Sequence, residues 1–233
     1  MLSAVTELRN RVESALEKRI PRALTPPQHP TPQRMLSGTA PLDALTGGIP
    51  LGCLTEICGL ASSGRTSILL SLAAECMRRG EICAWIDTSD AFDPQSAAHA
   101  GMDLGRLLWV RCKEKEESGV GKRKVRSLPS VGQSFDLKAS SKLDQALKTA
   151  DLLLQAGGFG LVVLDLADMP VSAARRIPLT TWFRFRRAVE NTSTAFIVSE
   201  QHPHAKSCAT LVVNLTAQSA SWREAADQNG TLI

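Results

Sequence analysis

Two glycines, Gly59 and Gly64, mark the part of the sequence that is best suited to do chemistry. They belong to the segment Gly59-Leu-Ala-Ser-Ser-Gly64-Arg65-Thr66, which follows one apolar stretch and precedes another. Glycines let backbone N–H groups turn toward a phosphate, and a helix N-terminus adds a positive dipole. The segment therefore predicts a phosphate-binding loop, with a strand-to-helix turn that binds no ligand as the alternative.

The side chains of this loop suggest how a nucleotide would be held. The residues predicted to bind it are Gly59, Ser62, Ser63, Gly64, Arg65, Thr66 and Ser67. The hydroxyl of Thr66, beside a basic residue, is a predicted Mg²⁺ ligand. Arg65 stands where the usual pattern has Lys, and its planar guanidinium can hold phosphate without placing a compact ammonium between the β- and γ-oxygens. Arg65 thus favours nucleotide binding over turnover.

A second candidate metal ligand ends another apolar run. In Gly160-Leu-Val-Val-Leu-Asp165 a buried strand is predicted to end at Asp165. A parallel-sheet NTPase places an acid there to hold the water shell of Mg²⁺. An isolated Asp at a strand end more often caps a turn or helix, so the prediction depends on the loop that contains Gly59.

Alternating strands and helices must position these residues. Strands are predicted at 54–58, 82–86, 160–164, 194–198 and 210–214, and helices at 66–79, 143–155 and 181–190. This order is typical of βαβ units, in which helices cover a largely parallel sheet and ligands bind at the carboxyl ends of the strands. The predicted fold class is α/β.

The remaining segments flank or interrupt this core. The predictions are an amphipathic helix at 1–20, a proline-rich linker at 21–35, the core at 36–215, a mobile insertion at 113–141 and a tail at 216–233. Apolar residues at three- and four-residue steps indicate the first helix, which either docks on a neighbour or folds back on its own domain. The insertion is rich in charge, Ser and Gly and lacks apolar periodicity.

The composition of the chain indicates a globular protein. The chain has 233 residues, of which 43% are hydrophobic and 21% charged, and its net charge is +4. These values are typical of a globular domain and do not indicate a nucleic-acid partner by themselves. No run approaches the roughly 18 apolar residues that a membrane span needs, and the first residues mix both charge signs, unlike a signal peptide. We therefore expect a cytoplasmic protein without membrane contact.

The order of the motifs resembles the core of the RecA recombinase family. The matching stretches are Leu42-Asp43, Gly47-Gly48-Ile-Pro50-Leu-Gly52, the loop at 59–66, Ala84-Trp-Ile-Asp87-Thr-Ser89-Asp90-Ala-Phe-Asp93-Pro94, Leu161 to Asp165, and Ile197-Val-Ser-Glu200-Gln201. The resemblance implies a P-loop core that binds ATP and Mg²⁺, with Gln201 sensing the γ-phosphate. It also implies that the helix and linker at the N-terminus act as the arm that packs on an adjacent subunit.

Three departures from the family pattern change the expected activity. Ser89 stands where the family has the Glu that activates water, and a hydroxyl is a poor general base near neutral pH. Asp90 is the neighbour that could substitute, although in an extended segment it would point away from the side on which Ser89 lies. Arg65 is the second departure. The third is that only 32 residues follow Gln201, so the core is expected to be truncated at its C-terminus.

A cluster of arginines is the last candidate site, for DNA or a protein partner. It comprises Arg175, Arg176, Arg184, Arg186 and Arg187, interleaved with Trp182, Phe183 and Phe185. The resemblance puts it at the first DNA loop, where guanidinium groups and aromatic faces suit single-stranded DNA. The alternative is a helix that buries Trp182, Phe185 and Val189 and leaves its arginines in solvent.

The resemblance, with its three departures, implies three alternative functions. The shortened core resembles ImuA-type accessory proteins of translesion synthesis and, more distantly, SulA-like cell-division inhibitors. The first function is an accessory protein of SOS damage tolerance, at the nucleoid, that binds ATP with little or no hydrolysis and engages a recombinase, a polymerase or single-stranded DNA. The second is a DNA-dependent ATPase with Asp90 as its base. The third is an adaptor that binds proteins without a nucleotide.

Overall fold

Six strands form one fully parallel sheet in residues 32–233. They are β3 (Cys53–Gly59), β4 (Cys83–Asp87), β5 (Leu107–Arg111), β6 (Leu161–Asp165), β7 (Ala195–Glu200) and β8 (Leu211–Leu215). Their order across the sheet is β5-β4-β6-β7-β3-β8. The first of these strands in the chain, β3, thus lies between the last two, at a point where the strand order reverses. Ligands bind at such points in open α/β sheets.

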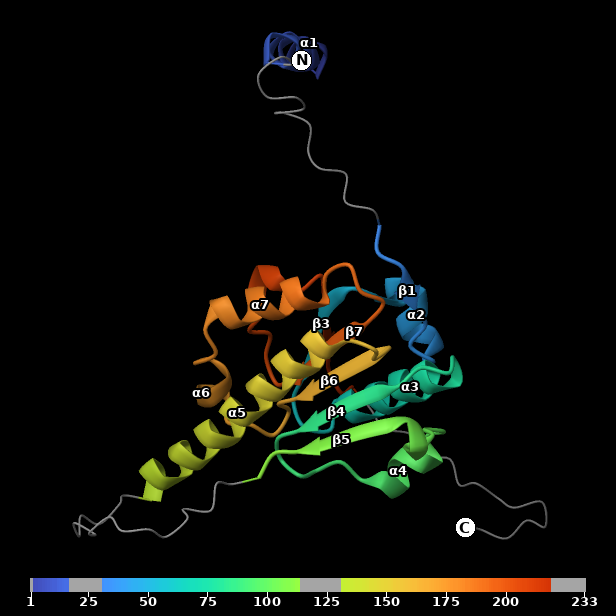
Figure 1. The fold of residues 1–233 in the computed structure, drawn as a ribbon, viewed down its shortest axis with the longest axis vertical. Helices are drawn as coiled ribbons and strands as arrows, with labels where there is room; N and C mark the ends of the chain where they lie inside the picture. Colours follow the sequence, from blue (N-terminus) through green and yellow to red (C-terminus); the bar gives the residue numbers. More distant parts are fainter. Residues whose placement is uncertain (1, 17–30, 114–130, 219–233) are drawn as a thin grey trace, which may run out of the picture. The chain divides into compact units, whose positions relative to one another are not determined.

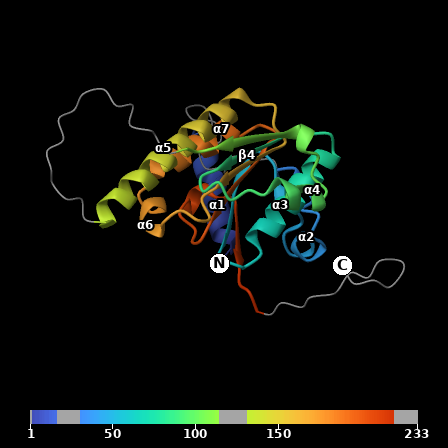
Figure 2. The same cartoon turned by 90° about the horizontal axis from the view of Figure 1, so that it is seen from below.

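Helices cover both faces of the sheet (Figures 1 and 2). On one face lie α2 (Ala40–Thr46), α3 (Arg65–Arg78) and α4 (Pro94–His99), and on the other lie α5 (Val131–Ala156), α6 (Val171–Ala174) and α7 (Leu179–Val189). The predicted α/β fold is confirmed, and each strand and helix predicted for the core is present.

The two faces of the sheet build two apolar cores, because successive side chains of a strand point to opposite sides. On β7, Phe196 packs with Trp182 and Phe185 of α7. Its neighbour Ile197 packs on the other side, in the core that contains Leu69 of α3. Strands buried on both faces are continuously apolar, which explains why these segments lack the alternating pattern of half-exposed strands.

The computed structural model describes residues 2–16, 31–113 and 131–218. Residues 2–16 belong to a separate unit, which contains α1 (Leu2–Leu16). The predicted N-terminal helix is therefore present as far as Leu16. Most of the predicted linker, residues 114–130 of the predicted insertion and residues 219–233 of the predicted tail lie outside the described residues.

Two predicted boundaries differ from the structure. β1 (Arg34–Met35) pairs antiparallel with β2 (Ile49–Pro50), and Met35 is fully buried, so the core begins inside the segment predicted as linker. A two-residue strand is too short for its pattern to appear in the sequence. α5 begins at Val131, inside the predicted insertion. Its later turns pack on the sheet, and adding residues to an existing helix costs less than starting one.

Two expectations from composition concern membranes and cysteines. Within the described ranges no helix is long and apolar enough to cross a membrane. All six cysteines are free, and only Cys53 is not buried. They act as small core residues, as their apolar sequence surroundings indicate.

Candidate nucleotide-binding site

The predicted phosphate loop joins β3 to α3 at the carboxyl edge of the sheet, where β3 is flanked by β7 and β8. Gly64 caps the N-terminus of α3 with φ +93°, and Ser62 has φ +61°. At Gly59 a Cβ atom would meet Ser63 Oγ and lie 2.7 Å from the carbonyl oxygen of Leu215. The sequence therefore needs glycine at both ends of the loop, for close packing at Gly59 and for a left-handed backbone at Gly64.

Two polar atoms of this loop are buried without a partner. Ser63 Oγ and Arg65 Nη1 have no hydrogen-bond partner among the residues that the structure describes, and Arg65 is 8% exposed. A buried guanidinium N–H group without an acceptor is costly. The first backbone N–H groups of α3 also lack acceptors within the helix. Phosphate oxygens accept hydrogen bonds from all of these donors, so the residues present fit a phosphate.

The predicted metal ligands are one hydroxyl and one carboxylate. Thr66 and Ser67 are exposed in the first turn of α3. Asp165 ends β6, where Oδ1 accepts a hydrogen bond of 3.1 Å from the backbone N–H of Ala167. Burial raises the pKa of Asp165 to about 6. The described residues contain no group of three or more metal-ligating side chains. A cation here would depend on phosphate oxygens and water, the usual coordination of Mg²⁺.

Gln201 follows β7 and reaches the loop that carries Asp165. Its Nε2 donates a hydrogen bond of 3.1 Å to the carbonyl oxygen of Ala167, and the backbone N–H of Leu166 donates one of 2.8 Å to the carbonyl oxygen of Ser199. The register of β6 and β7 places Asp165 opposite Ser199. The structure thus brings Gln201 and Asp165 to the same edge of the sheet.

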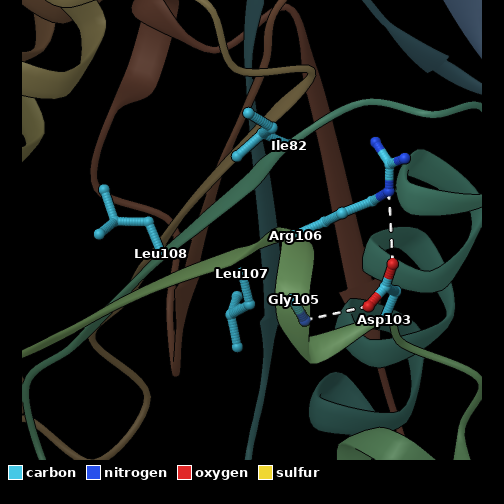
Figure 3. Close-up of a pocket in the computed structure, with 6 residues that line it drawn as sticks. All are labelled: Ile82, Asp103, Gly105, Arg106, Leu107 and Leu108. Atoms are coloured by element: carbon cyan, nitrogen blue, oxygen red, sulfur yellow. Dashed lines mark hydrogen bonds and ion pairs between the residues drawn. The ribbon is translucent and has the colours of Figure 1, made fainter.

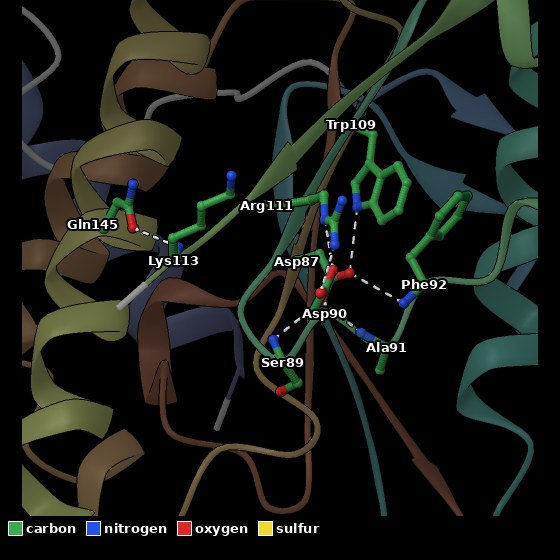
Figure 4. Close-up of polar contacts among 9 residues, drawn as sticks. All are labelled: Asp87, Ser89, Asp90, Ala91, Phe92, Trp109, Arg111, Lys113 and Gln145. Carbon is green, nitrogen blue, oxygen red and sulfur yellow. Dashed lines mark hydrogen bonds and ion pairs between the residues drawn. The ribbon is translucent and has the colours of Figure 1, made fainter. Parts of the chain in front are cut away.

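The turn after β4 is organised around Asp87, which is 1% exposed (Figure 4). Asp87 Oδ1 accepts hydrogen bonds from the backbone N–H groups of Ser89 and Ala91 at 3.1 and 3.2 Å. Asp87 Oδ2 accepts them from Phe92 N–H at 3.0 Å and from Trp109 Nε1 at 3.3 Å. This carboxylate holds the turn in place, a role that the sequence pattern did not reveal.

Asp90, the candidate base, is bound to an arginine. Its two carboxylate oxygens lie 2.6 Å from Nε and Nη2 of Arg111, and these hydrogen bonds lower the pKa of Asp90 (Figure 4). A carboxylate with a lowered pKa that is held by two charged hydrogen bonds is a poor proton acceptor. The geometry therefore disfavours Asp90 as a general base.

Two of the three aromatic residues of α7 belong to the core. Trp182 and Phe185 are 0% exposed and Val189 is 1% exposed, so the buried-helix alternative describes them correctly, whereas Phe183 is 48% exposed. Buried rings cannot stack on bases. Arg184 Nε lies 2.9 Å from Asp151 Oδ1, and Arg186 Nη1 lies 3.1 Å from the carbonyl oxygen of Ser207. Arg175, Arg176 and Arg187 are exposed.

A basic cavity of about 340 Å³ lies between the end of α6, the start of α7 and the connection after Gln201. It is lined by Arg175, Ile177, Leu179, Trp182, His204 and Lys206. Two of these side chains are cationic and none is a carboxylate. Lys206 has φ +52°, a backbone conformation that non-glycine residues seldom adopt and that often occurs at functional sites. Sequence reasoning had not selected Lys206.

A second cavity, of about 550 Å³, lies at the opposite edge of the sheet (Figure 3). Its lining residues are Ile82, Asp103, Gly105, Arg106, Leu107 and Leu108. Asp103 accepts a hydrogen bond of 3.0 Å from Gly105 N–H and pairs with Arg106 at 3.3 Å. These residues stand where β4 and β5 begin, so the cavity is separate from the phosphate loop.

Sequence reasoning also missed a buried carboxyl pair. Glu56 on β3 and Glu200 on β7 are 0% and 1% exposed. Both bond to residues 204–205 of the connection. The available signal was a glutamate inside an apolar strand, because a charged residue is rarely fully buried unless it is paired.

Comparison with known proteins supports the RecA-like core. Residues 21–121 match the family model of the RecA N-terminal domain. Protein RecA from Ruegeria pomeroyi is 34% identical over 119 residues, which make up 51% of this chain and 26% of that protein. Protein RecA from Wigglesworthia glossinidia brevipalpis is 31% identical over 120 residues, 52% of this chain and 28% of that protein. The chain spans about a quarter of the length of these relatives.

Proposed function

We propose, from this RecA-like core, that the chain is a nucleotide-binding accessory protein of DNA repair, which binds ATP with little or no hydrolysis. The observation that carries the proposal is the pair of buried, unpartnered polar atoms at the phosphate loop, Ser63 Oγ and Arg65 Nη1, among the described residues. A ligand with several strong acceptor oxygens would complete their hydrogen bonding.

ATP and Mg²⁺ are the expected ligands. Residues 59–67 would surround the phosphates, Thr66 and Asp165 would hold the cation, and Gln201 would lie near the terminal phosphate. Mg²⁺ neutralises phosphate charge when bound. Efficient hydrolysis would also need a base to orient water. Ser89 is a poor base and Asp90 is bound to Arg111, so we favour an ATP-binding switch over a DNA-dependent ATPase.

The partner surface is proposed to be the basic cavity and the arginines beside it. Arg175 and Lys206 place two positive charges at one cavity, which suits a phosphate of single-stranded DNA or an acidic side chain of a protein. The short connection at residues 202–210 and the chain's resemblance to ImuA-type proteins favour an accessory role in translesion synthesis. We expect engagement of a recombinase or a polymerase complex, with single-stranded DNA as an additional ligand.

The first test is equilibrium binding of a fluorescent ATP analogue with Mg²⁺. Wild type should bind saturably, and Gly64→Asp should abolish binding because it adds a negative charge at the phosphate loop. Gly80→Asp is the matched control. Gly80 has φ +85° and open space around it, as Gly64 does, but it follows the other end of α3. Equal binding by the two variants would refute the site.

The second test adds a single-stranded oligonucleotide to the same titration. A reciprocal effect of the oligonucleotide and the nucleotide on each other's affinity would establish coupling between the two sites. Oligonucleotide binding that Arg175→Ala weakens and ATP does not alter would argue against a switch. Capture of a purified recombinase in the presence of ATP, but no oligonucleotide binding, would favour the protein partner over DNA.

A further inference from the structure

A cluster of two carboxyl groups and one imidazole lies beside the strand that leads into the phosphate loop. Glu56 Oε1 accepts hydrogen bonds of 2.7 Å from the backbone N–H groups of both His204 and Ala205. Glu200 Oε2 lies 2.6 Å from His204 Nδ1. Since β3 and β7 are neighbours in the sheet, the cluster ties two strands to the connection that follows Gln201.

One oxygen of each carboxyl group lacks a partner. Glu56 Oε2 and Glu200 Oε1 are buried and have no hydrogen-bond partner in the described part of the chain. Two ionised carboxylates can only accept hydrogen bonds, so neither oxygen could satisfy the other. The two carboxyl groups lie within hydrogen-bonding reach of each other, so one proton shared between Glu200 and Glu56 removes both deficits. The remaining oxygen, Glu200 Oε2, accepts a hydrogen bond from His204 Nδ1 when that nitrogen carries the ring proton.

The electrostatics of the cluster agree with one shared proton. Burial and the hydrogen bond with Glu56 raise the pKa of Glu200 to about 9. Burial lowers the pKa of His204, so its imidazole is neutral at pH 7. Burial raises the pKa of Cys58 to about 12, which keeps the nearby thiol neutral as well. The charged or titratable groups that face the cluster in the described part of the chain also include Arg65, Arg175, His202 and Cys208.

We propose that Glu56 and Glu200 share one proton and act, with His204, as positioning residues for the wall of the basic cavity. His204 and Lys206 line that cavity, and Glu56 fixes the backbone between them. Glu56 lies three residues before Gly59, and Glu200 immediately precedes Gln201. Glu56 and Glu200 therefore link two strands to the connection that lines the cavity. One of these strands leads into the nucleotide loop, and the other leads to Gln201. The effect on a cavity ligand rests on the proposed function, whereas the shared proton does not.

The shared proton is tested by the pH dependence of unfolding in wild type and Glu200→Gln. The folded protein holds a proton that the unfolded chain has released above a pH of about 4.3, so stability falls as pH rises and levels off above the pKa of about 9. One proton corresponds to about a tenfold change in the folding constant per pH unit. Between pH 6 and 8.5, wild type should show this additional slope relative to Glu200→Gln. Equal slopes would overturn the proposal.

An infrared spectrum of the wild-type protein tests the same proton without a variant. At pH 7.5, above the pKa of Asp165, which burial raises to about 6, a carbonyl band of a protonated carboxyl group should remain. It should disappear as the pH passes about 9. Absence of the band at pH 7.5 would show that both glutamates are ionised and would refute the shared proton even if Glu200→Gln fails to fold.

The positioning role is tested with Glu56→Ala and Glu56→Gln. The amide oxygen of Gln still accepts hydrogen bonds from His204 and Ala205, whereas Ala removes the acceptor. Hydrogen exchange at these two amides should be at least tenfold faster in Glu56→Ala than in wild type, and Glu56→Gln should restore protection. Glu75→Ala is the control, since Glu75 pairs with Arg78 at the surface of α3. Unchanged exchange in Glu56→Ala would refute the role.

The effect on the cavity is measured with a single-stranded oligonucleotide, well below the melting temperature of each variant. Glu56→Ala should bind it at least fivefold more weakly, while Glu56→Gln should bind as wild type does. A merely stabilising residue would leave this affinity unchanged, and that result would overturn positioning of the cavity. If wild type binds no oligonucleotide, the proposed DNA contact is wrong. The pH dependence of unfolding and the hydrogen exchange of residues 204 and 205 then still test the shared proton and the positioning role of Glu56.

Discussion

The turn after β4 and the loop after β3 lie at the same edge of one sheet but differ in how they satisfy their polar groups. In the turn, Asp87 accepts four hydrogen bonds, and Asp90 is paired with Arg111 through both oxygens. In the loop, Ser63 Oγ and Arg65 Nη1 are buried and have no partner within the described ranges.

This difference separates a structural turn from a ligand site. A turn that satisfies its own hydrogen bonds is complete without any other molecule. A loop with buried, unpartnered donors is destabilised by them until a ligand supplies the acceptors. Removing a buried polar side chain should therefore destabilise the protein at the turn and stabilise the ligand-free protein at the loop. The following predictions test this difference.

The largest effect is expected for Asp87→Ala, which leaves three backbone N–H groups and the Trp109 indole N–H without their acceptor. At about 1–3 kcal/mol for each buried donor, with partial rescue by water, unfolding should become about 3–5 kcal/mol easier. Denaturant unfolding measures this. A loss below about 1 kcal/mol would show that the turn does not depend on Asp87.

The second prediction concerns Arg65→Met, which replaces a buried charge by an apolar side chain of similar length. The ligand-free protein should become about 1–2 kcal/mol more stable, because the buried Nη1 group, which has no partner among the described residues, is removed. Affinity for an ATP analogue should fall roughly 10- to 100-fold, which is the loss expected when one hydrogen bond between charged groups is removed. Thermal unfolding with and without nucleotide measures both effects in one experiment.

Arg78→Met is the control for this prediction. Arg78 lies in the same helix, but its side chain is 73% exposed and pairs with Glu75. It should change neither stability nor nucleotide affinity appreciably, because exposed ion pairs contribute little. If Arg65→Met instead destabilised the ligand-free protein, Arg65 would be a structural residue and the contrast between the two regions would fail.

Much of the fold could be predicted because its signals are local and repeated. The strands are short apolar runs, and the helices α3 and α7 have apolar residues at helical spacing. Each prediction needed only neighbouring residues. The sequence did not predict β1 because two residues are too few to show a period, and Met35 is buried through contacts with residues distant in the sequence. The sequence did not predict the start of α5 because the segment before residue 142 has no sustained apolar period, and extending an existing helix needs no such pattern.

The candidate site was less predictable, because its parts depend on contacts between distant segments. The glycines at 59 and 64 were recognisable, since the loop itself requires them. Sequence alone could not show that Asp90 is bound by Arg111, 21 residues away. Nor could it show that Glu56 holds residues 204–205, which lie 148 and 149 residues further along the chain. The spacing of residues in the sequence indicates which side chains could act in a site, but the contacts they make in the folded protein determine the role of each one.

The third prediction tests Asp165 as the cation ligand. Adding Mg²⁺ should raise the affinity of wild type for an ATP analogue, and in Asp165→Asn this gain should be about tenfold smaller. The reason is that a neutral amide is a weaker Mg²⁺ ligand than a carboxylate. Binding without Mg²⁺ should change little. Asp168→Asn is the control, as Asp168 is exposed after the same strand. Equal Mg²⁺ dependence in both variants would exclude Asp165 as the cation ligand.

The smallest effect is expected for Asp90→Asn, and it distinguishes an ATP-binding switch from an ATPase. Asp90 and Arg111 are about half exposed, so solvent screens their attraction and the substitution should leave stability nearly unchanged. Any phosphate release, with or without single-stranded DNA, should also change by less than twofold, because Arg111 already occupies both carboxylate oxygens. A loss of DNA-stimulated phosphate release in Asp90→Asn would mean that Arg111 releases Asp90 when ligands bind. The turn after β4 would then be part of the catalytic site, and the contrast with the loop after β3 would describe only the ligand-free state.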